Sequence, residues 1–217
     1  MSAREDSKRL KEFDESIRVR EGVEVIAGFD EAGRGPLCGP VVAAGCILPR
    51  GFSCPFIDDS KKLTPKSRKK AEEAIKEGAI AYAIEFVYPE EIDRINILEA
   101  SRVGMERCLE KLLEKIKVEF LITDYMKLHT DIPTLSIPKG DATSQCVAAA
   151  SILAKTARDE YMEKIALEYP EYGFEKHKGY PTKAHIEALE KYGVIEGLYR
   201  LTYGPVRKIL KDTGLRR

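Results

Sequence analysis

The stretch VIAGFDEAGRGPLCGPVVAAGCIL, residues 25–48, decides how this chain folds. Two apolar runs, residues 23–30 and 40–48, flank a turn that is rich in glycine and proline. Apolar runs of this length between Gly and Pro are typical of buried β-strands, and the short turn predicts that the two strands pair. Asp30 closes the first run and Glu31 follows it, so charged residues come where the apolar pattern stops.

Helical and strand patterns alternate through the rest of the chain. Apolar residues at helical spacing predict an amphipathic helix over 5–20, ahead of the first strand. We expect further strands at 79–88, 118–123 and 134–138, helices at 64–77, 97–116, 141–168 and 182–193, and a loop over 169–182. This order predicts a mixed sheet covered by helices, an α/β fold. It divides the chain into a helical extension, 1–22, and one domain, 23–217.

The composition excludes several classes of protein. The chain has 217 residues, 43% hydrophobic and 33% charged, which is typical of a soluble globular domain. Lys+Arg and Asp+Glu both total 36, so a nucleic-acid site would have to be a local basic patch. No apolar stretch reaches the ~18 residues of a membrane span. The five cysteines form no C-x-x-C pair, and a reducing cytoplasm is the simplest compartment for them.

Carboxylates stand at the ends of the predicted elements. Asp30 ends the first strand, Asp124 ends the fourth, and Asp141 begins a helix. If the two strands are parallel neighbours, Asp30 and Asp124 emerge at the same edge of the sheet, where sites gather in α/β folds. Glu31 points to the opposite face of a regular strand. It therefore joins the other carboxylates only if the strand breaks there, which the glycines that follow would allow.

Convergent carboxylates repel one another unless a cation neutralises them. Oxygen ligands favour Mg²⁺ or Mn²⁺ over zinc, and two such ions can hold the attacking water and the leaving oxygen of a phosphodiester. The alternative is that each acid is separately a cap or turn residue, the commoner role of Asp at element ends. Composition and spacing alone support the two interpretations about equally.

Two further patterns indicate contact with nucleic acid. Gly33-Arg34-Gly35 would let backbone N–H groups approach a phosphate or ribose closely, although a simple turn is the commoner explanation. Basic residues gather over 61–70 and again over 177–183, where Tyr180 lies among them. Cations beside a stacking ring are typical of a nucleic-acid contact. The first basic run is also explained by a solvated helix face.

The chain resembles the ribonuclease HII family in several stretches that follow one another in the family's order. The matching stretches are residues 28–44, 59–63, 96–98, 139–141, 149–159 and 177–183. The resemblance implies the ribonuclease H fold, a five-stranded mixed sheet flanked by helices with a helical C-terminal part. It also implies an endonuclease that hydrolyses the RNA strand of RNA–DNA hybrids. Such an enzyme also nicks 5′ of ribonucleotides embedded in duplex DNA, leaving 3′-hydroxyl and 5′-phosphate ends.

The resemblance also implies the roles of individual residues. Two Mg²⁺ or Mn²⁺ ions would be held by Asp30, Glu31, Asp124 and Asp141. The substrate would be bound by Gly33, Arg34 and Gly35 at the ribonucleotide, by Tyr180 at the RNA–DNA junction, and by Ser60, Lys61 and Lys178. We expect a monomer.

The sequence departs from the family pattern in two places. Tyr125-Met126 follow Asp124 where many members have small residues, and no sliding-clamp motif is seen near the C-terminus. The sister family, ribonuclease HIII, is disfavoured because it carries a sizeable extra N-terminal domain and a different residue at the position of Arg34. A Holliday-junction resolvase of the same fold and a non-catalytic hybrid-binding module are the competing functions.

Overall fold

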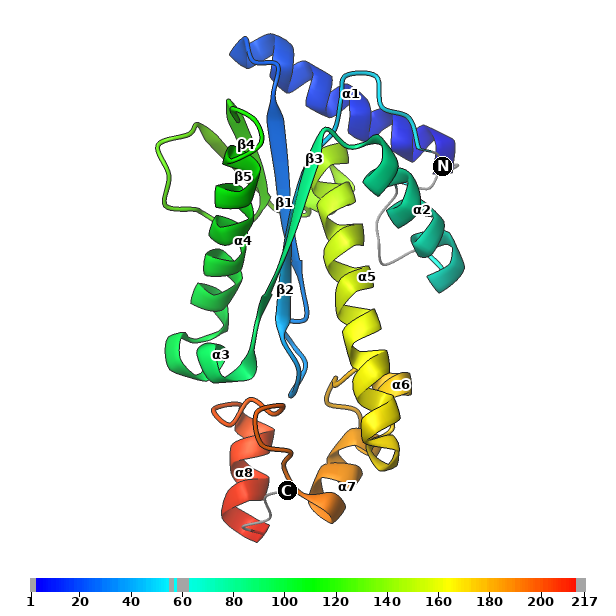
Figure 1. Cartoon of the computed structure of the whole chain (residues 1–217), viewed down its shortest axis with the longest axis vertical. Coiled ribbons are helices and arrows are strands. Elements are labelled where there is room, and N and C mark those ends of the chain that lie inside the picture. The colour runs from blue at the N-terminus through cyan, green and yellow to red at the C-terminus, as the bar shows by residue number, and fades with distance from the viewer. Residues whose placement is uncertain (1–2, 55–56, 58–62, 214–217) are drawn as a thin grey trace.

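The computed structural model describes residues 3–54, 57 and 63–213 (Figure 1). The strands are β1 (Ile26–Ala32), β2 (Val41–Ile47), β3 (Ala81–Val87), β4 (Phe120–Asp124) and β5 (Thr134–Ile137). The α-helices are α1 (Ala3–Glu21), α2 (Pro65–Gly78), α3 (Pro89–Ile95), α4 (Ile97–Leu113), α5 (Gln145–Glu168), α6 (Phe174–His177), α7 (Lys183–Tyr192) and α8 (Gly204–Thr213). Two 3-10 turns are η1 (Gly140–Ala142) and η2 (Pro170–Tyr172).

The five strands form one mixed sheet in the order β3-β2-β1-β4-β5. β1 pairs antiparallel with β2 and parallel with β4, and β4 pairs parallel with β5. The predicted mixed sheet and the predicted pairing of the first two strands are confirmed. Because β1 and β4 are parallel neighbours, their carboxyl ends meet at one edge of the sheet, as the argument from Asp30 and Asp124 required.

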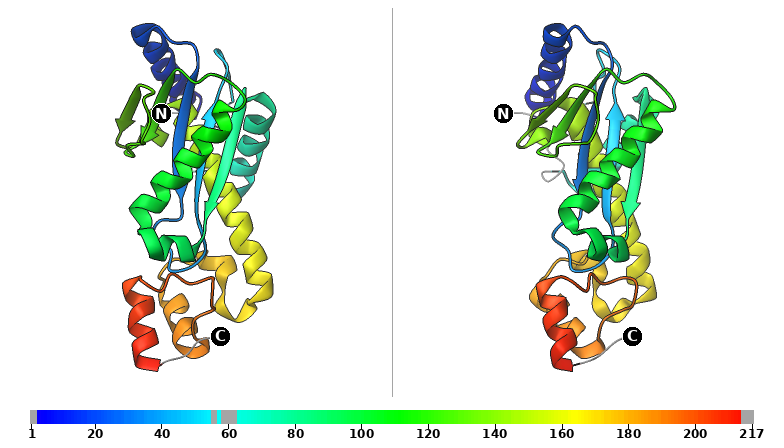
Figure 2. Two further views of the ribbon diagram at one scale, coloured as in Figure 1. Left: turned by 60° about the vertical axis from the view of Figure 1, so that its left-hand side comes forward. Right: turned by 90° about the vertical axis from the view of Figure 1, so that its left-hand side faces the viewer.

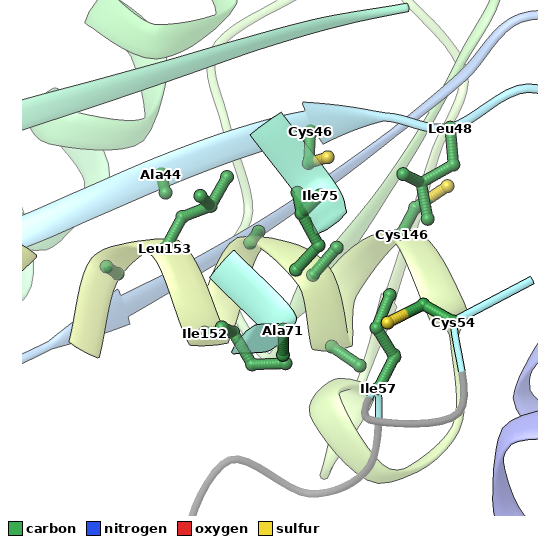
Figure 3. Close-up of a cluster of buried hydrophobic side chains, with 14 of the residues drawn as sticks. Ala44, Cys46, Leu48, Cys54, Ile57, Ala71, Ile75, Cys146, Ile152 and Leu153 are labelled. Carbon is green, nitrogen blue, oxygen red and sulfur yellow. The ribbon is translucent and has the colours of Figure 1, made fainter. Parts of the chain in front are cut away.

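Helices cover both faces of the sheet (Figures 1 and 2). Neighbouring residues of β2 pack to opposite sides, as the period of a strand dictates. Ala44 and Cys46 join a core cluster with α5 and α2, shown in Figure 3, and Ala43 and Ile47 join a second cluster with α4. Both faces of the central strands are therefore buried, which explains their nearly continuous apolar sequence.

The contact between β1 and α5 depends on a glycine. A Cβ atom on Gly28 would lie 2.3 Å from the carbonyl carbon of Cys146, so no larger residue fits there. At the same end of α5, Asp14 of α1 accepts the backbone N–H of Cys146 at 2.9 Å. The positive end of the helix dipole stabilises a carboxylate at this position. The N-terminal helix therefore packs on the sheet layer and also helps to cap α5.

The C-terminal helices lie beyond the end of β1 and β2 (Figure 1). Their core includes stacked Tyr172 and Phe174 rings 5.3 Å apart, together with buried Tyr199. An isolated antiparallel bridge joins Cys38, in the turn between β1 and β2, to Tyr199. The glycine-rich turn is thus attached to the C-terminal helices.

The structure corrects two sequence predictions. The helix predicted over 141–168 begins only at Gln145, because Ser144 is extended and its hydroxyl accepts the N–H of Val147. Asp141 lies before that cap in the separate turn η1 and is not the helix cap. The loop predicted over 169–182 contains η2 and α6, which pack on the aromatic core described above.

The first strand also differs from its predicted bounds of 23–30, because β1 runs on to Ala32. All five cysteines are buried and none forms a disulfide. None of the helices in the described part of the chain has the length and apolar character needed to cross a membrane.

Candidate active site

A cavity of about 270 Å³ opens at the carboxyl ends of β1 and β4. Asp30, Glu31 and Asp124 line it, together with residues 33–35 and Tyr180. Three of the four predicted carboxylates, the Gly-Arg-Gly segment and the predicted junction tyrosine therefore share one cavity. These residues come from two strands, a turn and the C-terminal part of the chain.

Asp30 faces α5 because it lies two residues after Gly28, on the same face of β1. The hydroxyl of Ser151 on α5 hydrogen-bonds Asp30, and the backbone N–H of Glu31 donates to Asp30 Oδ1 at 2.7 Å. Burial and the charge of Glu31 raise the pKa of Asp30 well above its ordinary value, and the charge of Asp124 raises it further. The cavity therefore concentrates negative charge in a site shielded from water.

Glu31 reaches the cavity without the strand break that the sequence argument required. β1 stays paired with β2 as far as Ala32, whereas its pairing with β4 ends at Phe29. One edge of β1 is therefore open beyond Phe29, and residues on both faces of the strand can line the space there. The Arg34 guanidinium lies 3.4 Å from Glu31 Oε1 and partly balances its charge.

Asp124 ends β4 and is tied to the turn that carries Asp141. The backbone N–H of Gly140 donates to Asp124 Oδ1 at 2.9 Å. Asp141 is 2% exposed and does not line the cavity, although it lies next to Gly140 in η1. Within the described residues, no three His, Cys, Asp or Glu side chains are grouped in a way that could hold a metal ion.

Tyr180 stands over the Gly-Arg-Gly segment. A Cβ atom on Gly35 would lie 3.4 Å from the Tyr180 ring, and the ring is backed by the Arg158 guanidinium at 5.9 Å. The backbone of Tyr180 is held as well, because Nδ1 of buried His185 donates to its carbonyl at 2.9 Å. The ring is fixed from behind, and Tyr180 as a whole residue is 42% exposed.

The remaining predicted contacts are not in this cavity. Lys178 makes an ion pair with Glu163 at 2.9 Å, and its side chain lines a different depression beside α5. Ser60 and Lys61 lie outside the described residues. Sequence reasoning missed Ser151 and Lys155, which both line the cavity. Their spacing of four places them on one face of α5, and two polar residues so spaced in an apolar helix were a usable signal.

Comparison with known proteins identifies the family. The family model described as Ribonuclease HII matches residues 27–203. Ribonuclease HII of Endomicrobium trichonymphae is 50% identical over 204 residues, covering 94% of this chain and 96% of the relative. Ribonuclease HII of Bacillus cytotoxicus is 45% identical over 203 residues, covering 94% of this chain and 77% of the relative.

Solved structures show the same fold. The crystal structure of ribonuclease H2 from Pyrococcus horikoshii aligns with a TM-score of 0.72 at 29% identity, covering 87% of this chain and 98% of that one. Bst ribonuclease HIII in complex with Mn²⁺ aligns with a TM-score of 0.66 at 21% identity, covering 87% of this chain and 70% of that one, and shows the fold alone. By its sequence matches, this chain belongs to the ribonuclease HII family and is a hydrolase of the ribonuclease H type.

Proposed function

We propose that this enzyme hydrolyses the RNA strand of RNA–DNA hybrids and nicks duplex DNA on the 5′ side of an embedded ribonucleotide. One observation carries the proposal: acidic, glycine-rich and aromatic groups line a single cavity. Asp30, Glu31 and Asp124 supply the acidic wall, and residues 33–35 supply backbone that can approach a ribose. The 2′-hydroxyl is the group that distinguishes RNA from DNA at such a position.

The chemistry of the donors fits Mg²⁺ or Mn²⁺. The acidic wall offers carboxylate oxygens only. Burial and then repulsion from Glu31 and Asp124 raise the pKa of Asp30, and a cation would relieve that repulsion. Asp30, Glu31 and Asp124 are the proposed ligands, with Asp141 as the fourth from the adjoining turn. Their side chains would have to close around the ion, because the described residues form no ready-made metal site. Two bound divalent ions would stabilise the charge on the attacking and leaving oxygens of the phosphodiester.

The protein groups around the acidic wall would select and orient the substrate. Backbone groups of residues 33–35 would contact the ribose, and the exposed ring of Tyr180 would stack on the neighbouring nucleotide. Lys155 lines the same cavity and could approach a backbone phosphate. Localisation in the cytoplasm and a monomeric state remain predictions from the sequence.

A cleavage assay tests the proposal against its competitors. With Mg²⁺ present, the enzyme should nick a duplex that carries one ribonucleotide, leaving 3′-hydroxyl and 5′-phosphate ends. An all-DNA duplex of the same sequence should stay intact. A protein that shifts the ribonucleotide duplex in a gel without cutting it would be a binding module. One that cuts only four-way junctions would be a resolvase, and either result would overturn the proposal.

A further inference from the structure

The turn between β1 and β2 is held by a buried arginine from the far end of the chain. Arg200 is 0% exposed, and its guanidinium donates to the carbonyl oxygens of Gly33 at 2.7 Å, Arg34 at 2.9 Å and Gly39 at 2.9 and 3.0 Å. One planar fork therefore fixes three peptide groups on both sides of the turn. Lysine could not do this, because its three N–H donors sit on one nitrogen and lack the spread of the rigid guanidinium fork.

Tyr203 completes this arrangement. Its hydroxyl donates to the carbonyl of Arg34 at 2.8 Å and accepts from Arg200 at 3.0 Å. The carbonyl of Arg34 thus receives two donors from the same short segment of the C-terminal part. Arg200 also donates its backbone N–H to the carbonyl of Leu37 at 2.9 Å, so this segment is joined to the turn through backbone as well as side chains.

A second buried arginine holds the other side of the turn. Arg158 of α5 donates to the carbonyls of Cys38 at 3.2 Å, Pro40 at 3.1 Å and Lys178 at 3.0 Å. A Cβ atom on Gly33 would lie 2.0 Å from Arg158 Nε, so the glycine lets the guanidinium pack against the turn. This arginine also backs the Tyr180 ring and so connects the turn to the stacking residue.

The two arginines make no ion pair with any described carboxylate, and their guanidinium groups donate to carbonyl oxygens and to the Tyr203 hydroxyl. Burial lowers the pKa of both guanidinium groups, and the charge of Arg200 lowers that of Arg158 further. Burying a charge is costly unless hydrogen bonds satisfy it. The carbonyl groups of the turn therefore offset the cost of burying the two guanidinium groups. The turn stabilises the arginines, and the arginines stabilise the turn.

The hydrogen bonds that fix the carbonyls of Gly33 and Arg34 also set the direction of the N–H groups that follow them in the chain. In a planar trans peptide, the C=O of one residue and the N–H of the next point in opposite directions. Because Arg200 and Tyr203 draw the carbonyls of Gly33 and Arg34 toward themselves, the N–H groups of Arg34 and Gly35 point away from these two side chains. Residues 33–35 line the cavity that also holds the carboxylates.

We propose that Arg200 and Tyr203 are positioning residues that fix the peptide planes of Gly33 and Arg34, so that the N–H groups of Arg34 and Gly35 face the ribonucleotide. The inference rests on the proposed function and adds to it. It makes the C-terminal segment around Arg200 a determinant of substrate selection, although its side chains are turned away from the substrate. Neither residue is catalytic in this account.

Two matched substitutions test this inference. Tyr203→Phe keeps the ring and removes the hydroxyl that holds the Arg34 carbonyl. Tyr172→Phe is the control, since the Tyr172 hydroxyl lies in the same C-terminal layer and donates at 2.8 Å to the carbonyl of Gly193, a residue outside the turn. Steady-state kinetics would be measured on a duplex with one ribonucleotide and on an all-RNA hybrid, beside a thermal melt of each protein.

Tyr203→Phe should lower kcat/KM on the single-ribonucleotide duplex by about 2- to 10-fold, the range for one lost hydrogen bond. The loss should lie in KM, because the N–H contacts form already in the bound complex. It should be smaller on the all-RNA hybrid, which offers many riboses. Tyr172→Phe should leave kcat/KM within about 2-fold and should lower the melting temperature more, because its hydrogen bond is buried.

Arg200→Lys should have a larger effect. Provided that the variant melts cooperatively, its KM on the single-ribonucleotide duplex should rise by about 10-fold or more. Equal kinetics for Tyr203→Phe and wild type would overturn the inference, and so would equal losses in Tyr203→Phe and Tyr172→Phe. Wild-type protein that leaves both substrates uncut would instead overturn the proposed function, a result that the variants cannot mimic.

Discussion

The backbone N–H of Gly140 donates to Oδ1 of Asp124 over 2.9 Å, which joins the end of β4 to the turn that carries Asp141. The bond uses one oxygen of Asp124 and leaves the other available to the cavity. It also ties the turn beyond β5 to the end of β4, although Asp141 itself does not line the cavity. A substitution at position 124 should therefore keep an acceptor for Gly140 if the fold is to be preserved.

Asp124→Asn meets that condition, because the amide oxygen can still accept from Gly140. We expect this variant to melt like the wild type and to lose cleavage by at least on the order of 100-fold, since it removes negative charge where a metal would bind. Asp131→Asn is the control, an equal change of charge on an exposed residue between β4 and β5. Near-normal cleavage by Asp124→Asn in the presence of Mg²⁺ would remove Asp124 from the proposed ligands.

Tyr180 should act through its ring more than through its hydroxyl. Stacking of an aromatic ring on a nucleotide contributes ~1–3 kcal/mol, roughly a 5- to 150-fold effect. Tyr180→Ala should therefore lower kcat/KM on a single-ribonucleotide duplex within that range, and Tyr180→Phe should be tolerated better. Thermal melts of both variants supply the control. A loss of activity that only follows the loss of folded protein would mean that Tyr180 packs its own loop and does not contact substrate.

Tyr125 holds a backbone conformation that favours glycine. Its φ is 57°, in the left-handed region, while its side chain is 77% exposed and gains little from packing. The left-handed conformation costs roughly 1–2 kcal/mol for a residue with a Cβ atom. Tyr125→Gly should therefore be more stable to denaturant than Tyr125→Ala, the reverse of the usual order for these two residues. An Ala variant as stable as the Gly variant would show that the backbone is relaxed there.

Buried His185 should make the stability of the protein depend on pH. Burial lowers the pKa of its imidazole from 6.5 to about 4, so the unfolded chain binds this proton more readily than the folded one. Stability should therefore fall as the pH drops from about 6.5 to about 4, by on the order of 3 kcal/mol at most. His185→Gln should flatten this part of the pH profile of chemical denaturation, whereas the same change at exposed His129 should leave it unaltered. An unchanged slope in His185→Gln would contradict the assignment.

The sheet could be predicted from the sequence because its strands are buried on both faces and read as apolar runs with clear ends. Asp30 and Asp124 could be placed together because each ends one of these recognisable strands, and parallel neighbouring strands bring their carboxyl ends to one edge. Asp141 was misplaced because Asp is a common helix cap, and only the structure shows that Ser144 has that role. Glu31 was misjudged because the open edge of β1 depends on where β4 stops pairing.

The two buried arginines could not have been found by local patterns. Arg158 lies in a helix where its sequence neighbours include Lys155 and Asp159, so it reads as part of a solvated charged face. Arg200 follows a short connection after α7 that has no helical or strand period. Their roles depend on carbonyl groups more than a hundred positions away, and a pattern within one window of sequence carries no record of such partners.

The hydrogen bonds from Arg200 and Tyr203 to Gly33 and Arg34 join residues 166 to 169 positions apart. Synthesis of the chain runs from the N-terminus, so all five strands and α5 exist before these partners are made. Contacts between distant residues are also the slow ones to form in folding, because the long intervening chain must be ordered first. The turn after β1 is therefore a part of the molecule whose final hydrogen bonds must wait for the C-terminal segment, whereas the strands that carry Asp30 and Asp124 are synthesised earlier.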